Sequence, residues 1–353
     1  MSPENLLLAL AVAMALLTGG TAMWQLRRLA RGGVVRRRIG LGIASALVFA
    51  FLLAALALCG ELYFRFAYDQ TDSFAFSRSS LRWFERHYHL NRSAFRDDVE
   101  YVPLRTAGKP RVSFLGDSFT EGQGIREVED RFVNRIRAAR PDWEIQALCR
   151  AGLETQGEIE LLQRVLDAGF QLDRVVLVYC LNDISDLVPS WGASMQQLAQ
   201  RRRERGWLVR HSYLADALDL RLLLQRDPGL SDYFGNLRGA YAGATWNAQQ
   251  ARLRALTQMV QEHGGTLLVV VFPFIHALGK DYAFADAHRA LATFWSSQGV
   301  PMLDLLPAFD GQPPDALRVN ARDAHPNERA NELAAQAILP FLDTHVHAGE
   351  LPR

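Results

Sequence analysis

The sequence contains little cysteine and no excess of charge of either sign. Three cysteines in 353 residues exclude a small disulfide-rich scaffold. A formal net charge of +1 argues against a nucleic-acid-binding protein, whose surface is usually strongly basic. The chain also lacks internal repeats, low-complexity tracts and the Cys-x-x-Cys or His-Glu-x-x-His spacings of metal sites. We therefore predict neither a repeat architecture nor a metal or other cofactor.

Two long apolar runs without a charged residue lie near the N-terminus, at residues 6–24 and 39–60. At about 1.5 Å of rise per residue, each is long enough as a helix to cross the roughly 30 Å hydrocarbon layer of a bilayer. Between them, residues 25–38 hold six arginines and no acid. We predict that residues 1–66 form a hairpin of two transmembrane helices in the cell membrane. A signal peptide for the first run and a buried core helix for the second are the alternatives.

The arginines of residues 25–38 also predict the orientation of this hairpin. Short positively charged loops stay in the cytoplasm, so both ends of the hairpin should face outward. Without those six arginines the rest of the chain carries 33 basic and 38 acidic side chains, a balance of about −5. The near-neutral total thus combines a cytoplasmic basic loop with an acidic C-terminal domain on the outer, periplasmic side.

Beyond residue 66, short apolar runs alternate with helical patterns. The apolar runs predict buried strands at residues 111–119, 143–149, 174–181, 266–273 and 301–306. Apolar residues at helical spacing predict helices at residues 127–140, 155–170, 246–263, 283–298 and 326–346. Strands that alternate with helices form a mostly parallel sheet covered on both faces, so the predicted fold class is α/β.

Two stretches fall outside this alternation. Residues 67–105 have an irregular pattern and are predicted to link the membrane hairpin to the domain at 106–353. Residues 184–245 form a long insertion after the third strand, where substrate specificity often lies. The insertion contains a basic run, which predicts a solvated helix face, with binding of an anionic partner as the alternative: Arg201, Arg202, Arg203 and Arg205.

A Gly-Asp-Ser sequence at residues 116–118 ends the first predicted strand. A serine at the carboxyl end of a parallel strand is exposed where α/β sheets bind ligands, and its amide can donate to a developing oxyanion. Residues 120–124 after Ser118 predict a flexible turn. The sequence is not a G-x-S-x-G elbow, because Thr120 stands at the glycine position, and no Gly-Lys-Ser/Thr of a phosphate loop follows. A serine that only caps the next helix is the alternative.

Three further motifs follow strands or precede the last helix. Gly152 follows the second strand, where a backbone amide can approach a ligand closely, and the side-chain amide of Asn182 ends the third. Both can donate to an oxyanion, although a turn residue and a cap are the alternatives. His325 precedes the last helix and can accept the Ser118 proton, with Asp323 fixing its tautomer.

This ordered set of motifs resembles the SGNH (GDSL) hydrolase superfamily, which is named after its Ser, Gly, Asn and His. The resemblance covers residues 111–330 and implies a flavodoxin-like three-layer α/β/α sandwich with a mostly parallel five-stranded sheet. It implies that Ser118 is the nucleophile, His325 the base and Asp323 its orienting acid. It also implies an oxyanion hole formed by Ser118, Gly152 and Asn182, and hydrolysis or transfer of an acyl ester through an acyl-serine.

Two positions depart from the family pattern. The third motif is usually G-x-N-D, and Cys180 occupies the glycine position, where a side chain can narrow the pocket or shift Asn182. The last motif is often D-x-x-H, whereas Asp323 stands two residues before His325 and Arg322 stands three before. Some relatives have the D-x-H form, so Asp323 is the predicted acid. Other members work as Ser–His dyads, which would also tolerate the altered spacing.

The sheet order of the family, 2-1-3-4-5, also bears on the cysteines. Cys149 and Cys180 would end the two strands that flank the first strand. Two strand spacings of about 4.8 Å separate them by nearly 10 Å, beyond the reach of a disulfide. We predict that both remain thiols in the core.

These observations support three functions. The first is a membrane-anchored serine ester hydrolase that acts at the outer side of the cytoplasmic membrane. The second is an O-acyltransferase that uses the same acyl-serine to modify an envelope polysaccharide. A tether at the membrane surface and the long insertion at residues 184–245 would suit such a bulky acceptor. The third is a catalytically silent scaffold, suggested by Cys180 and the Asp323 spacing. The predicted partners are the lipid bilayer and an acyl ester, with a glycan as a further substrate class.

Overall fold

The computed structural model describes residues 2–29, 34–231 and 233–346. By its internal contacts the chain divides into two compact units. The first unit comprises residues 1–69, 76–82 and 198–226, and the second comprises residues 70–75, 83–197 and 227–353. The α/β sheet and all predicted site residues belong to the second unit.

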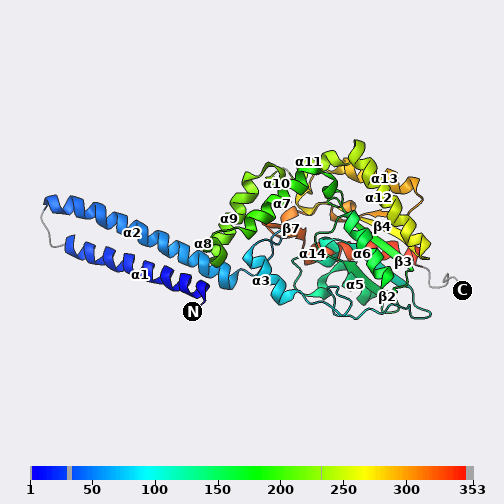
Figure 1. The fold of residues 1–353 in the computed structure, drawn as a ribbon, viewed down its shortest axis with the longest axis horizontal. Coiled ribbons are helices and arrows are strands. Elements are labelled where there is room, and N and C mark those ends of the chain that lie inside the picture. The colour runs from blue at the N-terminus through cyan, green and yellow to red at the C-terminus, as the bar shows by residue number, and fades with distance from the viewer. Residues whose placement is uncertain (1, 30–33, 232, 347–353) are drawn as a thin grey trace. The chain divides into compact units, whose positions relative to one another are not determined.

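A five-stranded parallel sheet forms the centre of the second unit (Figure 1). Its order is β2-β1-β3-β4-β5, as the family resemblance predicted, and every neighbouring pair is parallel. Each predicted apolar run forms one strand: β1 (Arg111–Gly116), β2 (Glu144–Cys149), β3 (Arg174–Cys180), β4 (Thr266–Phe272) and β5 (Met302–Asp304). Nearly all side chains of β1 to β4 are buried, because helices cover both faces.

The helices divide into two layers, which confirms the predicted three-layer sandwich. On one face α5 (Phe132–Ala139) packs against α14 (Glu328–His345). On the other face α12 (Gly243–Glu262) packs against α6 (Thr155–Asp167) and, through Trp246 and Phe294, against α13 (Ala285–Ser297). This arrangement follows from the crossovers between successive parallel strands, which are right-handed and place each helix on a defined face.

The predicted helices differ from the observed ones mainly at their first turns. The helix predicted at residues 127–140 is a 3₁₀ turn, η2 (Val128–Asp130), followed by α5. The last helix begins at Glu328 rather than at Pro326, because Asn327 is its N-cap and accepts a hydrogen bond from the Ala330 amide at 3.1 Å. The residues before it form an unpredicted antiparallel pair, β6 (Arg318–Asn320) and β7 (Asp323–Pro326).

The flexible turn predicted at residues 120–124 is wrong in part. Ser118–Glu121 form a short buried helix, α4, and Gln123 is buried as well. The turn is confined to the two glycines, Gly122 and Gly124, whose φ angles of 74° and 87° favour glycine. The segment after Ser118 is therefore held rigidly by its surroundings.

The stretch at residues 67–105 is more ordered than an irregular linker. It contains α3 (Arg78–His87), and its later part is fastened to the second unit by arginine side chains. Arg96 is fully buried; it stacks on Trp83 and donates to the carbonyls of Gly122, at 2.6 Å, and Ile125. This part of the chain therefore belongs to the second unit, and it supports the loop that follows Ser118.

The first unit contains the two apolar helices, α1 (Pro3–Leu29) and α2 (Val34–Leu62), which pack against each other. Both are longer than the apolar runs, so residues 25–29 and 34–38 are helical, and residues 30–33 lie outside the described residues. The candidate spans Pro3–Leu29 and Ile39–Ala67 have mean hydropathies of 2.1 and 2.6, which are high enough for membrane spans, although a signal sequence or a core helix can pass the same test. A π-helical turn, η1 (Tyr63–Ala67), follows α2.

The insertion at residues 184–245 consists of a 3₁₀ turn and short helices: η3 (Ser185–Leu187), α7 (Pro189–Arg203), α8 (Trp207–His211), α9 (Tyr213–Arg226), α10 (Pro228–Ser231) and α11 (Tyr233–Ala240). The prediction of a solvated basic face is wrong for Arg202, which is buried within the first unit. It forms ion pairs with Asp216 and, at 2.9 Å, with Asp219 on α9. A buried arginine is stable only when it is paired in this way.

The cysteines of the second unit are buried and free, as predicted. Cys149 ends β2, which pairs with one side of β1, and Cys180 ends β3, which pairs with the other side. Burial raises the pKa of both thiols, so they remain neutral packing groups.

Candidate active site

The candidate site lies at the carboxyl edge of the sheet, where β1 ends and α4 begins. Asp117 is the N-cap of α4, and its carboxylate accepts a hydrogen bond from the Phe119 amide at 2.8 Å. Ser118 is the first residue of this helix and is nearly buried. A Cβ at Gly116 would lie 2.2 Å from the Thr120 hydroxyl, so the tight turn requires glycine at that position.

The structure brings Ser118, His325 and Asp323 together in one hydrogen-bonded chain. The Oγ atom of Ser118 lies 2.7 Å from Nε2 of His325, and Nδ1 of His325 lies 2.5 Å from Oδ1 of Asp323. All three side chains are buried, and Ser118 is 207 residues away from His325 in the sequence. The order of the contacts is that of a nucleophile, a base and an orienting acid.

The short D-x-H spacing is explained by the strand that carries both residues. In a β-strand, residues i and i+2 lie on the same face, and Asp323 and His325 are so placed in β7. The backbone amide of His325 also donates to Asp323 Oδ1, at 3.1 Å.

Asp323 and His325 each shift the pKa of the other toward its charged form. Burial lowers the pKa of His325, but the charge and hydrogen bond of Asp323 raise it more, so the net shift is upward from 6.5. Burial raises the pKa of Asp323, but the charge and hydrogen bond of His325, together with further hydrogen bonds, lower it below its ordinary value. Asp323 is thus ionised at neutral pH, and it favours the protonated imidazole that forms when His325 accepts a proton.

The predicted oxyanion donors lie around the same strand ends. Asn182 follows β3, and its Nδ2 donates to Oδ2 of Asp117 at 3.1 Å, which leaves its second N–H available. Gly152 has a φ of 78°, and a Cβ there would meet no atom within 4 Å, so there is open space beside its backbone. Asp117, which the sequence analysis left without a role, therefore orients Asn182.

Cys180 does not displace Asn182 from this position. Its side chain is fully buried in the core, and its amide donates to Oδ2 of Asp183 at 3.0 Å. The backbone of the same turn is held by two further contacts: Thr155 donates to the Asp183 carbonyl at 3.0 Å, and Tyr241 donates to the Leu181 carbonyl at 2.9 Å. A cysteine in place of glycine is thus compatible with the Asn182–Asp117 contact.

A second group of carboxyls lies buried behind the site. Both carboxyl oxygens of Glu158 are buried and accept no hydrogen bond from any residue in the described part of the chain. Burial and the charge of Asp117 raise the pKa of Glu158 well above its ordinary value, and burial and Glu158 do the same for Asp183. Both shifts disfavour the ionised form, because burying a carboxylate near other carboxyls is unfavourable.

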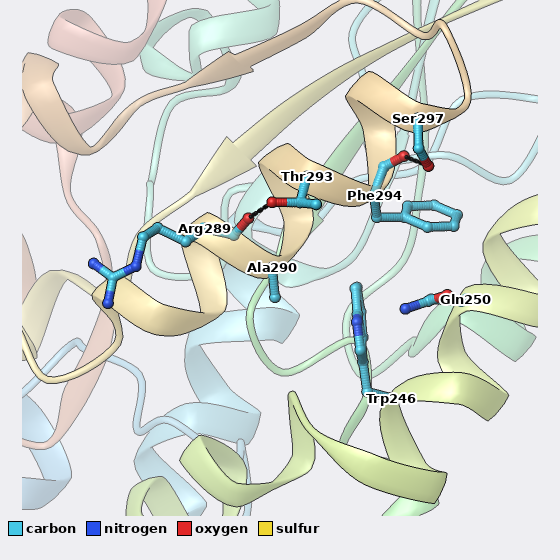
Figure 2. A pocket seen from close by; sticks show the side chains of 7 residues that line it. All are labelled: Trp246, Gln250, Arg289, Ala290, Thr293, Phe294 and Ser297. Carbon is cyan, nitrogen blue, oxygen red and sulfur yellow. Dashed lines mark hydrogen bonds between the residues drawn. The ribbon is translucent and has the colours of Figure 1, made fainter.

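A cavity of about 430 Å³ between α12 and α13 shares no residue with the predicted site (Figure 2). The rings of Trp246 and Phe294 line it, and the hydroxyls of Thr293 and Ser297 donate to backbone carbonyls of their own helix. Its lining includes no histidine or carboxylate that could act as a base toward those hydroxyls.

The α/β/α sandwich and the Ser–His–Asp chain are the features of a serine hydrolase. The family model described as the GDSL-like Lipase/Acylhydrolase family matches residues 114–333, more than half of the chain. The protein therefore belongs to this family, and it is an ester-acting hydrolase of the GDSL/SGNH type.

Solved structures of the same kind resemble the chain at low identity. An extracellular lipase from Streptomyces rimosus is 14% identical, with a TM-score of 0.44, over 67% of this chain and 99% of the lipase. A lipolytic G-D-S-L family member from Veillonella parvula is 14% identical, with a TM-score of 0.42, over 66% and 98%. An acetyl xylan esterase from Geobacillus stearothermophilus is 16% identical, with a TM-score of 0.41, over 71% and 100%. The curated proteins contain no match.

The Asp117–Asn182 contact predicts coupled effects on catalysis. Asn182→Ala should lower kcat for ester hydrolysis by about 10²-fold, the effect of losing one oxyanion donor. Asp117→Asn should lower kcat by about tenfold or more, because one acceptor for Asn182 and Phe119 becomes a donor. Since part of the Asp117 effect passes through Asn182, the double variant should be slower than Asn182→Ala by less than the factor that Asp117→Asn produces alone. Fully multiplicative losses would contradict this, and Asp167→Asn on the exposed face of α6 is the control.

The buried Glu158 predicts a loss of stability with increasing pH. Its pKa is raised in the folded state, so its proton stabilises the fold below the ordinary pKa, and this stabilisation is lost as pH rises. Glu158→Gln should therefore match wild type near pH 5 and exceed its Tm by about 2–4 °C or more near pH 9. Thermal unfolding at several pH values measures the difference, and the exposed Glu262→Gln is the control. A difference independent of pH would show that Glu158 does not titrate between the two states.

Proposed function

We propose that the protein is a membrane-anchored serine esterase that acts on an acyl ester at the outer face of the cytoplasmic membrane. The observation that carries the proposal is the buried chain of hydrogen bonds from Asp323 through His325 to Ser118. In the proposed roles Ser118 is the nucleophile, His325 the general base and Asp323 the orienting acid.

The geometry supports a two-step reaction. Ser118 Oγ attacks the ester carbonyl carbon while its proton passes to Nε2 of His325, 2.7 Å away. The developing oxyanion is bound by the amides of Ser118 and Gly152 and by Nδ2 of Asn182. His325 then protonates the leaving alcohol, which leaves an acyl-serine. Water attacks this intermediate with His325 again as base, and Ser118 is regenerated.

The altered motif positions favour an active enzyme over a silent scaffold. Asp323 reaches His325 despite its spacing, and Asn182 is oriented despite Cys180. Burying a carboxylate, an imidazole and a hydroxyl in one chain of hydrogen bonds costs stability. Retaining all three therefore favours a chemical role for them. A glycan hydroxyl in place of water would make the same acyl-serine the intermediate of a transfer reaction.

The anchor is supported by the surface of the two long helices. Large apolar side chains on both are mostly exposed, for example Leu16 at 72% and Leu56 at 70%. Such a surface is unfavourable in water and stable in hydrocarbon. Arg27 and Arg28 lie in the last turn of α1, and the other four arginines of residues 25–38 follow them in the sequence. We therefore propose that this end of the hairpin is cytoplasmic.

Ester hydrolysis by the full-length protein in detergent tests the catalytic proposal. Wild type should hydrolyse a short p-nitrophenyl ester and react with a fluorophosphonate probe. Ser118→Ala should lose the labelling and lower kcat by about 10⁴-fold or more, because the nucleophile is absent. Equal rates for the two proteins would show that Ser118 is not the nucleophile. The acyl-enzyme lifetime with and without an added oligosaccharide then separates transfer from hydrolysis.

The orientation is tested by cysteine labelling in intact cells. In a Cys59→Ala background the remaining cysteines are buried, so a single introduced thiol reports its side of the membrane. An impermeant maleimide should label Glu262→Cys, in the catalytic unit, and should label Arg28→Cys only after the membrane is permeabilised. The reverse pattern would contradict the proposed topology, and labelling of both in intact cells would contradict a membrane hairpin.

A further inference from the structure

Residues 70–75, which directly follow the membrane hairpin unit, lie beside the strand that carries Asp323 and His325. The amide of Ser73 donates to the Arg322 carbonyl at 3.1 Å, and the Ala324 amide donates to Ser73 Oγ at 3.0 Å. Asn320 Nδ2 donates to the Thr71 carbonyl at 3.1 Å. This segment is therefore attached to the chain on both sides of Asp323.

The hydroxyl of Thr71 makes the contact that matters for the site. It donates to Oδ2 of Asp323, and both side chains are fully buried. The other carboxylate oxygen, Oδ1, accepts from Nδ1 and from the amide of His325. Within the described residues, Thr71 is the one donor to Oδ2, so each oxygen of the carboxylate is held by a different segment.

We propose that Thr71 is a positioning residue of the reaction, one that acts on Ser118 through Asp323 and His325. This inference rests on the proposed function. A carboxylate bound through one oxygen can rotate about its Cβ–Cγ bond, because that torsion is broad and has no strong minima. A donor on the second oxygen fixes the plane of the carboxylate, and with it the direction in which His325 presents Nε2 to Ser118.

The surroundings of Thr71 hold its hydroxyl in place. Gln123, in the loop after Ser118, donates from Nε2 to the Asp72 carbonyl at 3.0 Å. A Cβ at Gly124 would lie 2.5 Å from Val319 and 3.0 Å from the Thr71 hydroxyl, so glycine is needed there for the segments to pack. Residues 70–75 are thus packed against the Ser118 loop as well as against β7.

Other charged groups near His325 remain unchanged when Thr71 is replaced. The carboxylates of Asp72 and Asp117 both raise the pKa of His325, in addition to Asp323 itself. Loss of the Thr71 donor makes the Asp323 carboxylate more basic, and it should therefore favour the protonated imidazole further. The acidic limb of the kcat/KM profile, which reports His325 in the free enzyme, should move to higher pH.

The test compares Thr71→Val with Thr71→Ser in the full-length protein in detergent. Valine keeps the shape and removes the donor, so kcat should fall about tenfold or more, the effect of losing one hydrogen bond to a charged group, with KM within about twofold. Serine keeps the donor and should restore kcat to within about threefold of wild type and the acidic limb to its wild-type position. Thr257→Val, whose hydroxyl bonds only to its own helix at Leu253, should leave activity unchanged.

Two measurements separate the possible failures. Wild-type kcat and an unmoved acidic limb in Thr71→Val would overturn the inference, as would equal losses in the valine and serine variants. The low-field proton resonance of the His325 Nδ1–H, which needs no substrate, should shift in Thr71→Val and not in Thr71→Ser. If the resonance behaves so but wild type neither hydrolyses esters nor labels at Ser118, the proposed function fails and the contact alone is confirmed.

Discussion

The site depends on the burial of one carboxylate. Asp323 is fully buried, and a buried charge is stable only when its oxygens are hydrogen-bonded. Its partners are His325, two residues along the same strand, and Thr71, which is 252 residues away. The hydrogen bonds that satisfy this carboxylate thus join residues 70–75, the β6–β7 pair and the imidazole in one arrangement, which places Nε2 of His325 within 2.7 Å of Ser118 Oγ.

The same principle operates on the other side of Ser118. Asp117 is buried at the start of α4, and it accepts hydrogen bonds from the Phe119 amide and from Asn182. One buried carboxylate therefore holds His325 and another holds Asn182, the residues proposed as the base and as an oxyanion donor. Near them, burial and mutual repulsion raise the pKa of Glu158 and of Asp183, which disfavours further negative charge in this region.

The fold was largely predictable because its signals are local. Buried parallel strands are continuous apolar runs, and all five runs became strands in the predicted order. Of the predicted site residues, Ser118, His325 and Asp323 lie in one hydrogen-bonded chain. Asn182 contacts Asp117 beside Ser118, since the carboxyl ends of β1 and β3 share one edge of the sheet. The linker and the insertion were not predictable in this way, because their helices are stabilised by tertiary contacts such as those of Arg96 and Arg202.

The sequence by itself determined the α/β class, the apolar hairpin with its basic connection, and the identity of the chemical groups, because periodicity, charge and motif order are properties of the chain. Only the tertiary structure decided that Asp117 orients Asn182, that β7 makes a two-residue spacing sufficient, and that Thr71 belongs to the site. The contacts of Asp117 with Asn182 and of Thr71 with Asp323 join distant segments, and the Asp323–His325 contact depends on the pairing of β7 with β6. No local pattern encodes them, since they arise only when the sheet and its loops have packed and each buried polar group has found a partner.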